Sequence, residues 1–337
     1  MQHLSDLVVD GSISAPATGS TPLLDVRDLT VTFSNGTESV QVVRGLDYSI
    51  AKGETLGIVG ESGCGKTMTS LALLGLIAGG GKVGGIIDFK GQDLAKFSQK
   101  QWQHLRGRRI AMIFQEPMTA MNPVMSVGRQ IAEVLVKHEG ISRKVAASRA
   151  VDLLDQVGIP SPARRAEDYP HQLSGGMRQR AMIAMALACK PELLIADEPT
   201  TALDVTIQAQ ILDLMLTLQD EANMSIQFIS HNLAVISEVA HAIMVMYAGK
   251  AVEYAPAQAL FDNPLHPYTQ GLIATLPDPD KPVKRLYVIP GRVTSDVIPG
   301  CRFAKRCPLA DEYCRQVEPE FLEVAPGHRV ACHKVKP

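Results

Sequence analysis

The chain has 337 residues, of which 46% are hydrophobic and 20% are charged, and its formal net charge is −2. This is the balance of a globular protein, long enough for two or three modest domains. A nearly neutral chain has no general electrostatic attraction for nucleic acid, and we expect no nucleic-acid partner. No run of about 20 apolar residues predicts a membrane-spanning helix. We therefore expect a cytosolic protein that at most binds to a membrane protein.

Residues 1–21 are expected to form a flexible tail rather than a signal peptide. No basic region precedes the short apolar stretch, and aspartates interrupt it.

The segment from residue 23 to residue 60 predicts strands. Residues 23–33 and 40–50 alternate apolar and polar residues, as half-exposed antiparallel strands do. The stretch "TLGIVG" at 55–60 is mostly apolar, which is typical of a strand buried on both faces. A helix is predicted to follow, from Lys66 to about Ala78.

Strands and helices then alternate, which predicts a parallel sheet with helices on its faces. A helical insertion at 116–173 interrupts this alternation, and a texture rich in Pro, Gly and Cys from about residue 264 predicts a small C-terminal domain. The further predicted strands are 109–114, 193–197 and 225–230, and the further predicted helical regions are 126–158, 174–189, 204–221 and 232–240.

The sequence "GESGCGKT" at 60–67 matches the pattern G-x-x-x-x-G-K-[ST] between a predicted strand and a predicted helix. Glycines allow backbone N–H groups to approach phosphates, and the helix adds its positive N-terminal end. Lys66 is predicted to reach the β- and γ-phosphates of ATP, and the Thr67 hydroxyl to bind Mg²⁺. The predicted ATP-binding residues are Gly60, Glu61, Ser62, Gly63, Cys64, Gly65, Lys66 and Thr67.

The sequence "LLIADEPT" at 193–200 supplies acidic groups at the end of a buried strand. Asp197 is predicted to hold Mg²⁺, through water. Glu198 follows where a general base for an attacking water is needed. Two adjacent acids after a strand can also be a simple cap, but the phosphate loop favours the catalytic interpretation.

A second anion site is indicated by "LSGGMRQR" at 173–180. Ser174 is predicted to cap a helix whose first turn, Gly175 and Gly176, presents bare amides to an anion. The motif resembles the signature of ABC-type ATPases. Two phosphate-binding elements in one chain are explained if each ATP lies between two subunits.

The resemblance implies roles for further residues of this chain. Gln115 would contact Mg²⁺ and the lytic water, and His231 would contact the γ-phosphate. Asp204, in "TALD", would cross a dimer interface to the partner's ATP, together with Ser174, Gly175 and Gly176. Phe33 is the candidate for stacking on adenine, although the inserted "SNGTES" disturbs its spacing.

The resemblance covers about residues 22–337 and implies a RecA-like α/β fold. It comprises a P-loop ABC nucleotide-binding domain with an antiparallel β subdomain, a helical subdomain and a small Cys-rich C-terminal domain. The expected division is a tail at 1–21, an ATPase domain at 22–263 with its helical subdomain at about 116–173, and a C-terminal domain at 264–337.

Within the ABC class, the chain resembles a transporter subunit rather than a DNA-repair or translation ATPase. No heptad repeats separate Lys66 from Ser174, and there is one cassette. Longer stretches, including "AMIFQEPMTAMNPVMSVGRQI" and "NPLHPYTQGL", resemble ATP-binding subunits of bacterial oligopeptide/dipeptide permeases, especially their D-type members. Importers of nickel, glutathione, opines or antimicrobial peptides share these motifs, and a soluble non-transport ABC ATPase is the rival from another class.

The permease resemblance also implies partners and a location. They are a paralogous ATP-binding subunit, two transmembrane permeases and, through these, an extracytoplasmic peptide-binding protein, at the cytoplasmic face of the inner membrane. Residues 116–127 would receive helices of the permeases, with Met118, Met121 and Met125 as an adaptable apolar socket or, alternatively, as ordinary core.

Four cysteines, Cys301, Cys307, Cys314 and Cys332, gather near the C-terminus. Disulfides are not expected in the cytosol, and four thiols suit zinc or an iron–sulfur cluster. Their spacing lacks the short pairs common at zinc sites. The family resemblance implies a [4Fe–4S] cluster with a structural role, while zinc and free thiols remain alternatives.

Overall fold

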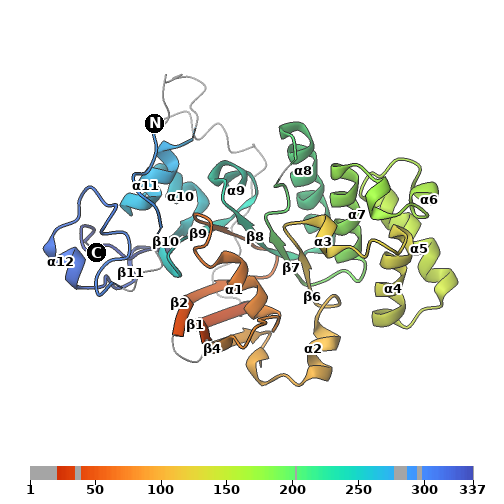
Figure 1. The fold of residues 1–337 in the computed structure, drawn as a ribbon, viewed down its shortest axis with the longest axis horizontal. Coiled ribbons are helices and arrows are strands. Elements are labelled where there is room, and N and C mark those ends of the chain that lie inside the picture. The colour runs from red at the N-terminus through yellow and green to blue at the C-terminus, as the bar shows by residue number, and fades with distance from the viewer. Residues whose placement is uncertain (1–20, 35–38, 202, 277–286, 294–297, 337) are drawn as a thin grey trace. The chain divides into compact units, whose positions relative to one another are not determined.

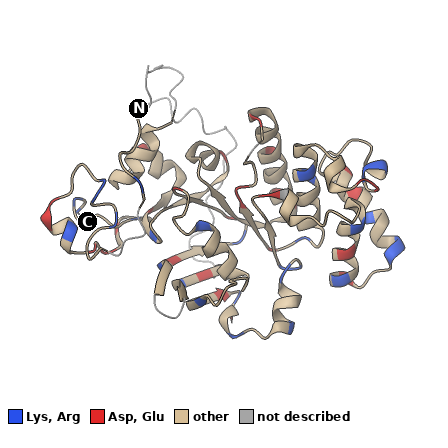
Figure 2. Cartoon of the chain, viewed as in Figure 1, with Lys and Arg blue, Asp and Glu red and all other residues tan. Residues whose placement is uncertain are grey.

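A computed structural model describes residues 21–34, 39–201, 203–276, 287–293 and 298–336. The expected flexible tail lies, except for its last residue, outside the described residues. The described residues form two compact units, the first comprising those up to Ala95 with those from Phe228 onwards and the second those within Lys96–Gln227. Most of their elements are labelled in Figure 1, and acidic and basic residues are interspersed along both units (Figure 2).

The first unit contains an antiparallel sheet that includes the two predicted N-terminal strands. β1 pairs with β2 in antiparallel register, with Leu24 opposite Ile50, as their alternating pattern predicts. β4 also pairs with β1, although the sequence did not reveal it, because a Gly-Gly pair weakens its strand signal. The sheet has the order β2-β1-β4-β5, with the bounds β1 (Leu24–Ser34), β2 (Ser39–Ile50), β4 (Lys82–Phe89) and β5 (Gln92–Asp93).

The second set of strands in this unit carries the phosphate loop. β3 is parallel to β9, and β9 is antiparallel to β10, which continues through β12 to β11. Every residue of β3 and β9 is buried, as their apolar sequences require. The strands are β3 (Thr55–Val59), β9 (Ala242–Tyr247), β10 (Lys250–Pro256), β11 (Leu322–Ala325) and β12 (His328–Val330).

The helices of the first unit are short. α1 is an eight-residue helix and ends earlier than predicted, at the left-handed Gly75. They are α1 (Lys66–Leu73), α9 (Leu233–Val239), α10 (Ala257–Asp262), α11 (Pro267–Ala274) and α12 (Glu312–Gln316), with a 3₁₀ turn at Leu94–Lys96.

A buried carboxylate ties the C-terminal segment to β10. Glu253 is 0% exposed and accepts hydrogen bonds from the backbone N–H groups of Leu265 (2.7 Å) and His266 (3.0 Å). His328 on β12 lies 2.8 Å from the same carboxylate. A buried carboxylate is stable only when paired and hydrogen-bonded, so these contacts fix the segment in place. The described C-terminal residues thus share one unit with the phosphate loop.

The second unit is mainly helical around two parallel strands. β6 pairs with β7 from Ile110 opposite Leu193 onwards. The predicted helical region at 126–158 is two helices, because Gly140 ends the first in a left-handed cap. The strands are β6 (Ile110–Ile113) and β7 (Leu193–Asp197), and β8 (Ser225–Ser230) spans the boundary of the two units. The helices are α2 (Gln99–Leu105), α3 (Pro117–Ala120), α4 (Val127–Glu139), α5 (Arg143–Gln156), α6 (Pro162–Arg165), α7 (Gly175–Leu187) and α8 (Val205–Ala222), with a 3₁₀ turn at Pro170–Gln172.

Within the described ranges, the helices are all too short or too polar to cross a bilayer.

Candidate nucleotide-binding site

The phosphate loop connects β3 to α1, as the sequence predicts, and is pressed closely against its neighbours. A Cβ atom at Gly60 would lie 2.3 Å from the Met246 carbonyl oxygen, and one at Gly65 would lie 2.7 Å from the Val42 carbonyl oxygen. Gly65 also has a φ of +102°, which disfavours any larger residue. The loop therefore requires glycine at both positions.

Lys66 lies inside this loop. Its side chain is buried, and its ammonium donates hydrogen bonds to the carbonyl oxygens of Gly60 (2.6 Å) and Glu61 (3.1 Å). A buried ammonium beside bare backbone amides and the N-terminus of a helix is a site for anions.

The other loop residues divide into exposed and buried ones. Ser62, Gly63 and Thr67 are exposed, which leaves the Thr67 hydroxyl open to solvent. Cys64 is fully buried, and burial raises the pKa of its thiol. Cys64 therefore serves as a small packing residue, and only its backbone is available to a ligand.

A pocket of about 250 Å³ lies beside the loop, within the first unit. Phe33, the candidate for stacking on adenine, is half-buried on β1 and packs against Gly81 rather than lining this pocket. The pocket-lining residues are Val40, Gln41, Val42, Arg44, Ser62, Gly63, Ala248, Val293 and Arg302.

The acidic groups of the second unit lie at the end of β7. Asp197 is buried as the last residue of the strand. Glu198 follows with a φ of +48°, an uncommon conformation for a residue other than glycine. Such strained positions gather at functional sites, because the surrounding structure must hold them.

Two side chains hold the Glu198 carboxylate in place. Gln115 donates a hydrogen bond from Nε2 to Glu198 Oε2 at 3.0 Å, and the Thr201 hydroxyl donates to the same oxygen at 2.9 Å. The sequence predicted functional roles for Gln115 and Glu198 but not their contact. The sequence does not predict the contact of Thr201 with Glu198, although Thr201 is the first residue of the "TALD" stretch.

The signature residues surround one pocket of about 490 Å³ in the second unit. Ser174 caps α7 as predicted, accepting a hydrogen bond from the Met177 N–H at 3.3 Å. Asp204 caps α8 by accepting from the Ile207 N–H at 2.9 Å. The pocket brings together all four residues predicted to contact a partner's ATP, which are Ser174, Gly175, Gly176 and Asp204.

His231 is exposed between the end of β8 and Asn232, which caps α9. It belongs to the first unit with Lys66, whereas Gln115, Asp197 and Glu198 belong to the second.

The three methionines of segment 116–127 do not share one environment. Met121 is 2% exposed and packs in the core, so the ordinary alternative holds for it. Met118 is 45% exposed, Met125 is half-buried, and Val124 between them is 78% exposed. An apolar socket for another protein is therefore limited to the exposed side chains.

The four C-terminal cysteines are free thiols near one another. Cys314 is buried and the other three are half-buried. Burial, together with the neighbouring thiols of Cys332, Cys307 and Cys314, raises the pKa of Cys301 to about 11. Across the described ranges, groups of three or more His, Cys, Asp or Glu side chains arranged to hold a metal ion are absent. The thiols as they lie are thus not a formed ligand set.

A phosphate loop, an Asp-Glu pair after a buried strand and a capped second anion pocket together define an ATP-binding cassette. Residues 43–201 match the family model described as ABC transporter. Residues 252–314 match the model described as oligopeptide/dipeptide transporter, C-terminal region.

Curated relatives match nearly the full chain. The chain is 50% identical over 314 residues to the dipeptide transport ATP-binding protein DppD of Escherichia coli, covering 92% of this chain and 96% of that protein. It is 48% identical over 314 residues to the oligopeptide transport ATP-binding protein AppD of Bacillus subtilis, with the same coverage. The chain therefore belongs to the family of ABC transporter ATP-binding subunits with an oligopeptide/dipeptide transporter C-terminal region.

Solved structures agree on the fold. The ATP-binding cassette MJ0796, solved as a dimer in a post-hydrolysis state with ADP and Pi, is 25% identical with a TM-score of 0.63, covering 69% of this chain and 98% of that one. Cassette cbiO1 of Clostridium perfringens is 24% identical with a TM-score of 0.62, covering 72% and 92%. The predicted RecA-like ABC ATPase fold is confirmed.

Proposed function

We propose that this chain is the ATP-hydrolysing subunit of a bacterial importer for dipeptides and oligopeptides. The observation that carries the peptide assignment is the oligopeptide/dipeptide transporter region at 252–314, in a chain half identical to a dipeptide transport ATP-binding protein. The match to the ABC transporter family model, together with the hydrogen bond that holds the Glu198 carboxylate, supports hydrolysis of ATP. The proposed domain division remains 1–21, 22–263 and 264–337.

Hydrolysis follows from the chemistry of the named residues. Lys66 leaves its carbonyl partners for the β- and γ-phosphates, and the loop amides bind the remaining phosphate oxygens. Mg²⁺, when bound, neutralises phosphate charge, and Thr67, Gln115 and Asp197 are the residues that would hold it. Glu198 orients the attacking water and accepts its proton, and His231 contacts the γ-phosphate.

The signature pocket serves the ATP of a partner subunit. Ser174 and the amides of Gly175 and Gly176 contact the partner-bound γ-phosphate, and Asp204 contacts the same ATP across the dimer interface. The one-pocket arrangement of these four residues supports this role. By likeness to the D-type subunits, the partner is a paralogue.

A bulky residue in this pocket should block the two-subunit site. Ser174→Arg should lower ATP hydrolysis by the assembled pair about tenfold or more, because the closed dimer cannot form. Ser142→Arg is the matched control, because Ser142 also caps a helix with a weak bond to a backbone N–H, at 3.4 Å, outside the pocket. Each loses a cap worth about 1 kcal/mol. Equal hydrolysis rates for the two variants would contradict the role of Ser174.

The membrane partners are two permeases and, through them, an extracytoplasmic peptide-binding protein. The exposed Met118 and Val124 support a permease contact at segment 116–127. The chain would then lie at the cytoplasmic face of the inner membrane.

The experiment for the proposed function is purification of the chain from membranes of cells that co-express candidate permease subunits, followed by dipeptide uptake in reconstituted vesicles. Co-purified permeases and ATP-dependent dipeptide uptake are expected. Uptake of nickel, glutathione or opines instead of dipeptide would assign a different substrate to the importer. Failure of the chain to co-purify with permeases would favour a soluble ATPase.

A [4Fe–4S] cluster on the four cysteines is part of the proposal. Its support is the gathering of Cys301, Cys307, Cys314 and Cys332 in one segment, close enough that the neighbouring thiols help to raise the pKa of Cys301 and of Cys307. Binding would require these thiols to deprotonate and to turn toward a common centre.

Anaerobic purification with iron, sulfide and zinc analysis tests the cluster. About four irons per chain and a brown colour are expected for this cluster type. Stoichiometric zinc, or a colourless protein without metal, would remove the cluster from the proposal and leave the ATPase assignment intact.

A further inference from the structure

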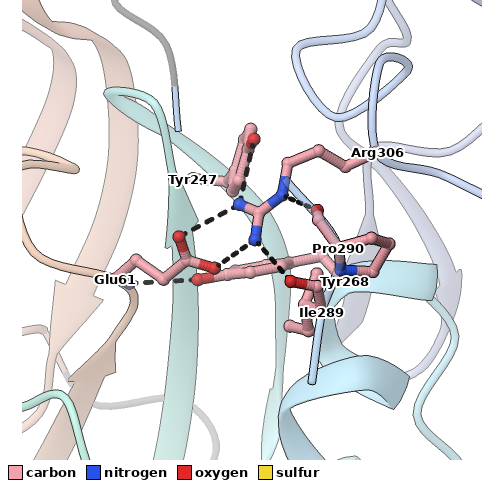
Figure 3. Close-up of polar contacts among 6 residues, drawn as sticks. All are labelled: Glu61, Tyr247, Tyr268, Ile289, Pro290 and Arg306. Carbon is pink, nitrogen blue, oxygen red and sulfur yellow. Dashed lines mark hydrogen bonds and ion pairs between the residues drawn. The ribbon is translucent and has the colours of Figure 1, made fainter. Parts of the chain in front are cut away.

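Two side chains from the C-terminal part of the first unit hold the phosphate loop at Glu61 (Figure 3). Arg306 donates from Nη1 to Glu61 Oε2 and from Nη2 to Glu61 Oε1, each at 3.0 Å. The Tyr268 hydroxyl accepts a hydrogen bond from the Glu61 backbone N–H, also at 3.0 Å. Glu61 is thus fixed at both its backbone and its carboxylate by residues 207 and 245 positions further along the chain.

Arg306 is fixed by its own surroundings. Its Nε donates to the Pro290 carbonyl at 2.7 Å, Nη1 to the Tyr247 hydroxyl at 3.4 Å, and Nη2 to the Ile289 carbonyl at 3.5 Å. With the two bonds to Glu61, the five N–H donors of the guanidinium are all engaged. The side chain is 6% exposed, against 30% for Glu61. Arg306 is therefore the rigid partner, and Glu61 is the residue that is positioned.

The pair also solves an electrostatic problem of the loop. A carboxylate in a loop that binds phosphates repels them unless a cation neutralises it. Burial acts to lower the pKa of Arg306, but the hydrogen bonds to Glu61 and Tyr247 outweigh it and raise the pKa overall. The guanidinium stays charged, and its two parallel bonds draw the carboxylate to one side.

We infer that Arg306 is a positioning residue for ATP binding, which acts through Glu61 to neutralise the phosphate loop and hold it in its anion-binding shape. The inference rests on the proposed binding of ATP at residues 60–67. It makes the stretch between Cys301 and Cys307 part of the support of the nucleotide site.

The test is ATP affinity of the full chain with Arg306→Gln. The Kd for MgATP should rise about tenfold, while turnover at saturating ATP stays within about twofold, because the residue does not touch the reacting atoms. Arg315→Gln is the matched control, because Arg315 lies on the same C-terminal segment, its side chain is 57% exposed, and its ion pair with Glu312 is long, at 3.9 Å. It should leave the Kd unchanged.

Two further variants separate positioning from mere stabilisation. Arg306→Lys keeps the charge but loses the paired bonds, and its Kd should lie between wild type and Arg306→Gln. Adding Glu61→Gln to Arg306→Gln should not weaken binding further, because the unpaired carboxylate is then gone.

The outcomes are distinct. A lower melting temperature with an unchanged Kd, or additive effects in the double variant, would overturn the inference. Failure of the wild-type chain to bind ATP would refute the proposed function and the inference with it, whereas normal binding by wild type and Arg306→Gln alike would refute the inference alone.

Discussion

Glu198→Gln is expected to abolish ATP turnover while ATP binding remains. A general base contributes about 100-fold to 10,000-fold to a rate, and the amide cannot accept the proton of the attacking water. Gln115 and Thr201 both donate to Glu198 Oε2, and an amide oxygen at that position can accept the same two bonds. The amide of the variant would therefore keep the position of the Glu198 carboxylate, and the variant would differ from the wild type mainly in its lost basicity.

Rapid-mix hydrolysis of MgATP by the assembled pair, together with a binding titration, measures this prediction. Glu221→Gln is the control, because Glu221 is an exposed carboxylate on α8 of the same unit. We expect the Glu198 variant to bind ATP normally and to accumulate as a closed dimer. Hydrolysis at the wild-type rate would exclude Glu198 as the base.

Lys66→Met is expected to remove ATP binding, with a rise in Kd of about 100-fold or more. The ammonium is the buried positive charge of the loop, and hydrogen bonds between an ammonium and phosphate oxygens are the strong, charge-assisted kind. Methionine preserves the apolar stem of lysine, so the packing of the loop changes little.

The control for this charge loss is Lys52→Met, an exposed lysine of the same unit. Its Kd for MgATP should match the wild type in a calorimetric titration. Tight ATP binding by Lys66→Met would mean that the phosphates are held elsewhere.

The strand and the helix cap that carry the candidate site were predictable because each is a local feature of the sequence. The strand at 193–197 and its Asp-Glu end were predicted at their true bounds, since an apolar run followed by two acids is a continuous signal. The N-terminal cap of α7 by Ser174 was also predicted, because a serine directly before two glycines is a local signal for the start of a helix. In such motifs the functional residues are neighbours in the sequence, so the motif can be recognised without knowledge of the fold.

The contacts that hold the site were not predictable. Glu61 and Arg306 are 245 positions apart, and no local pattern distinguishes Arg306 from the other arginines. The same is true of Gln115 and Glu198, whose separate roles were inferred without their hydrogen bond. β4 was missed because its Gly-Gly pair suppresses the alternation by which β1 and β2 were recognised.

The most direct measurement is ATP hydrolysis by the complex of this chain with its partner subunit and permeases, with and without a peptide-loaded binding protein. For a peptide importer, we expect a hydrolysis rate that rises when dipeptide is supplied and that vanishes with Glu198→Gln. A rate that is indifferent to peptide and to the permeases would contradict the assignment to peptide import.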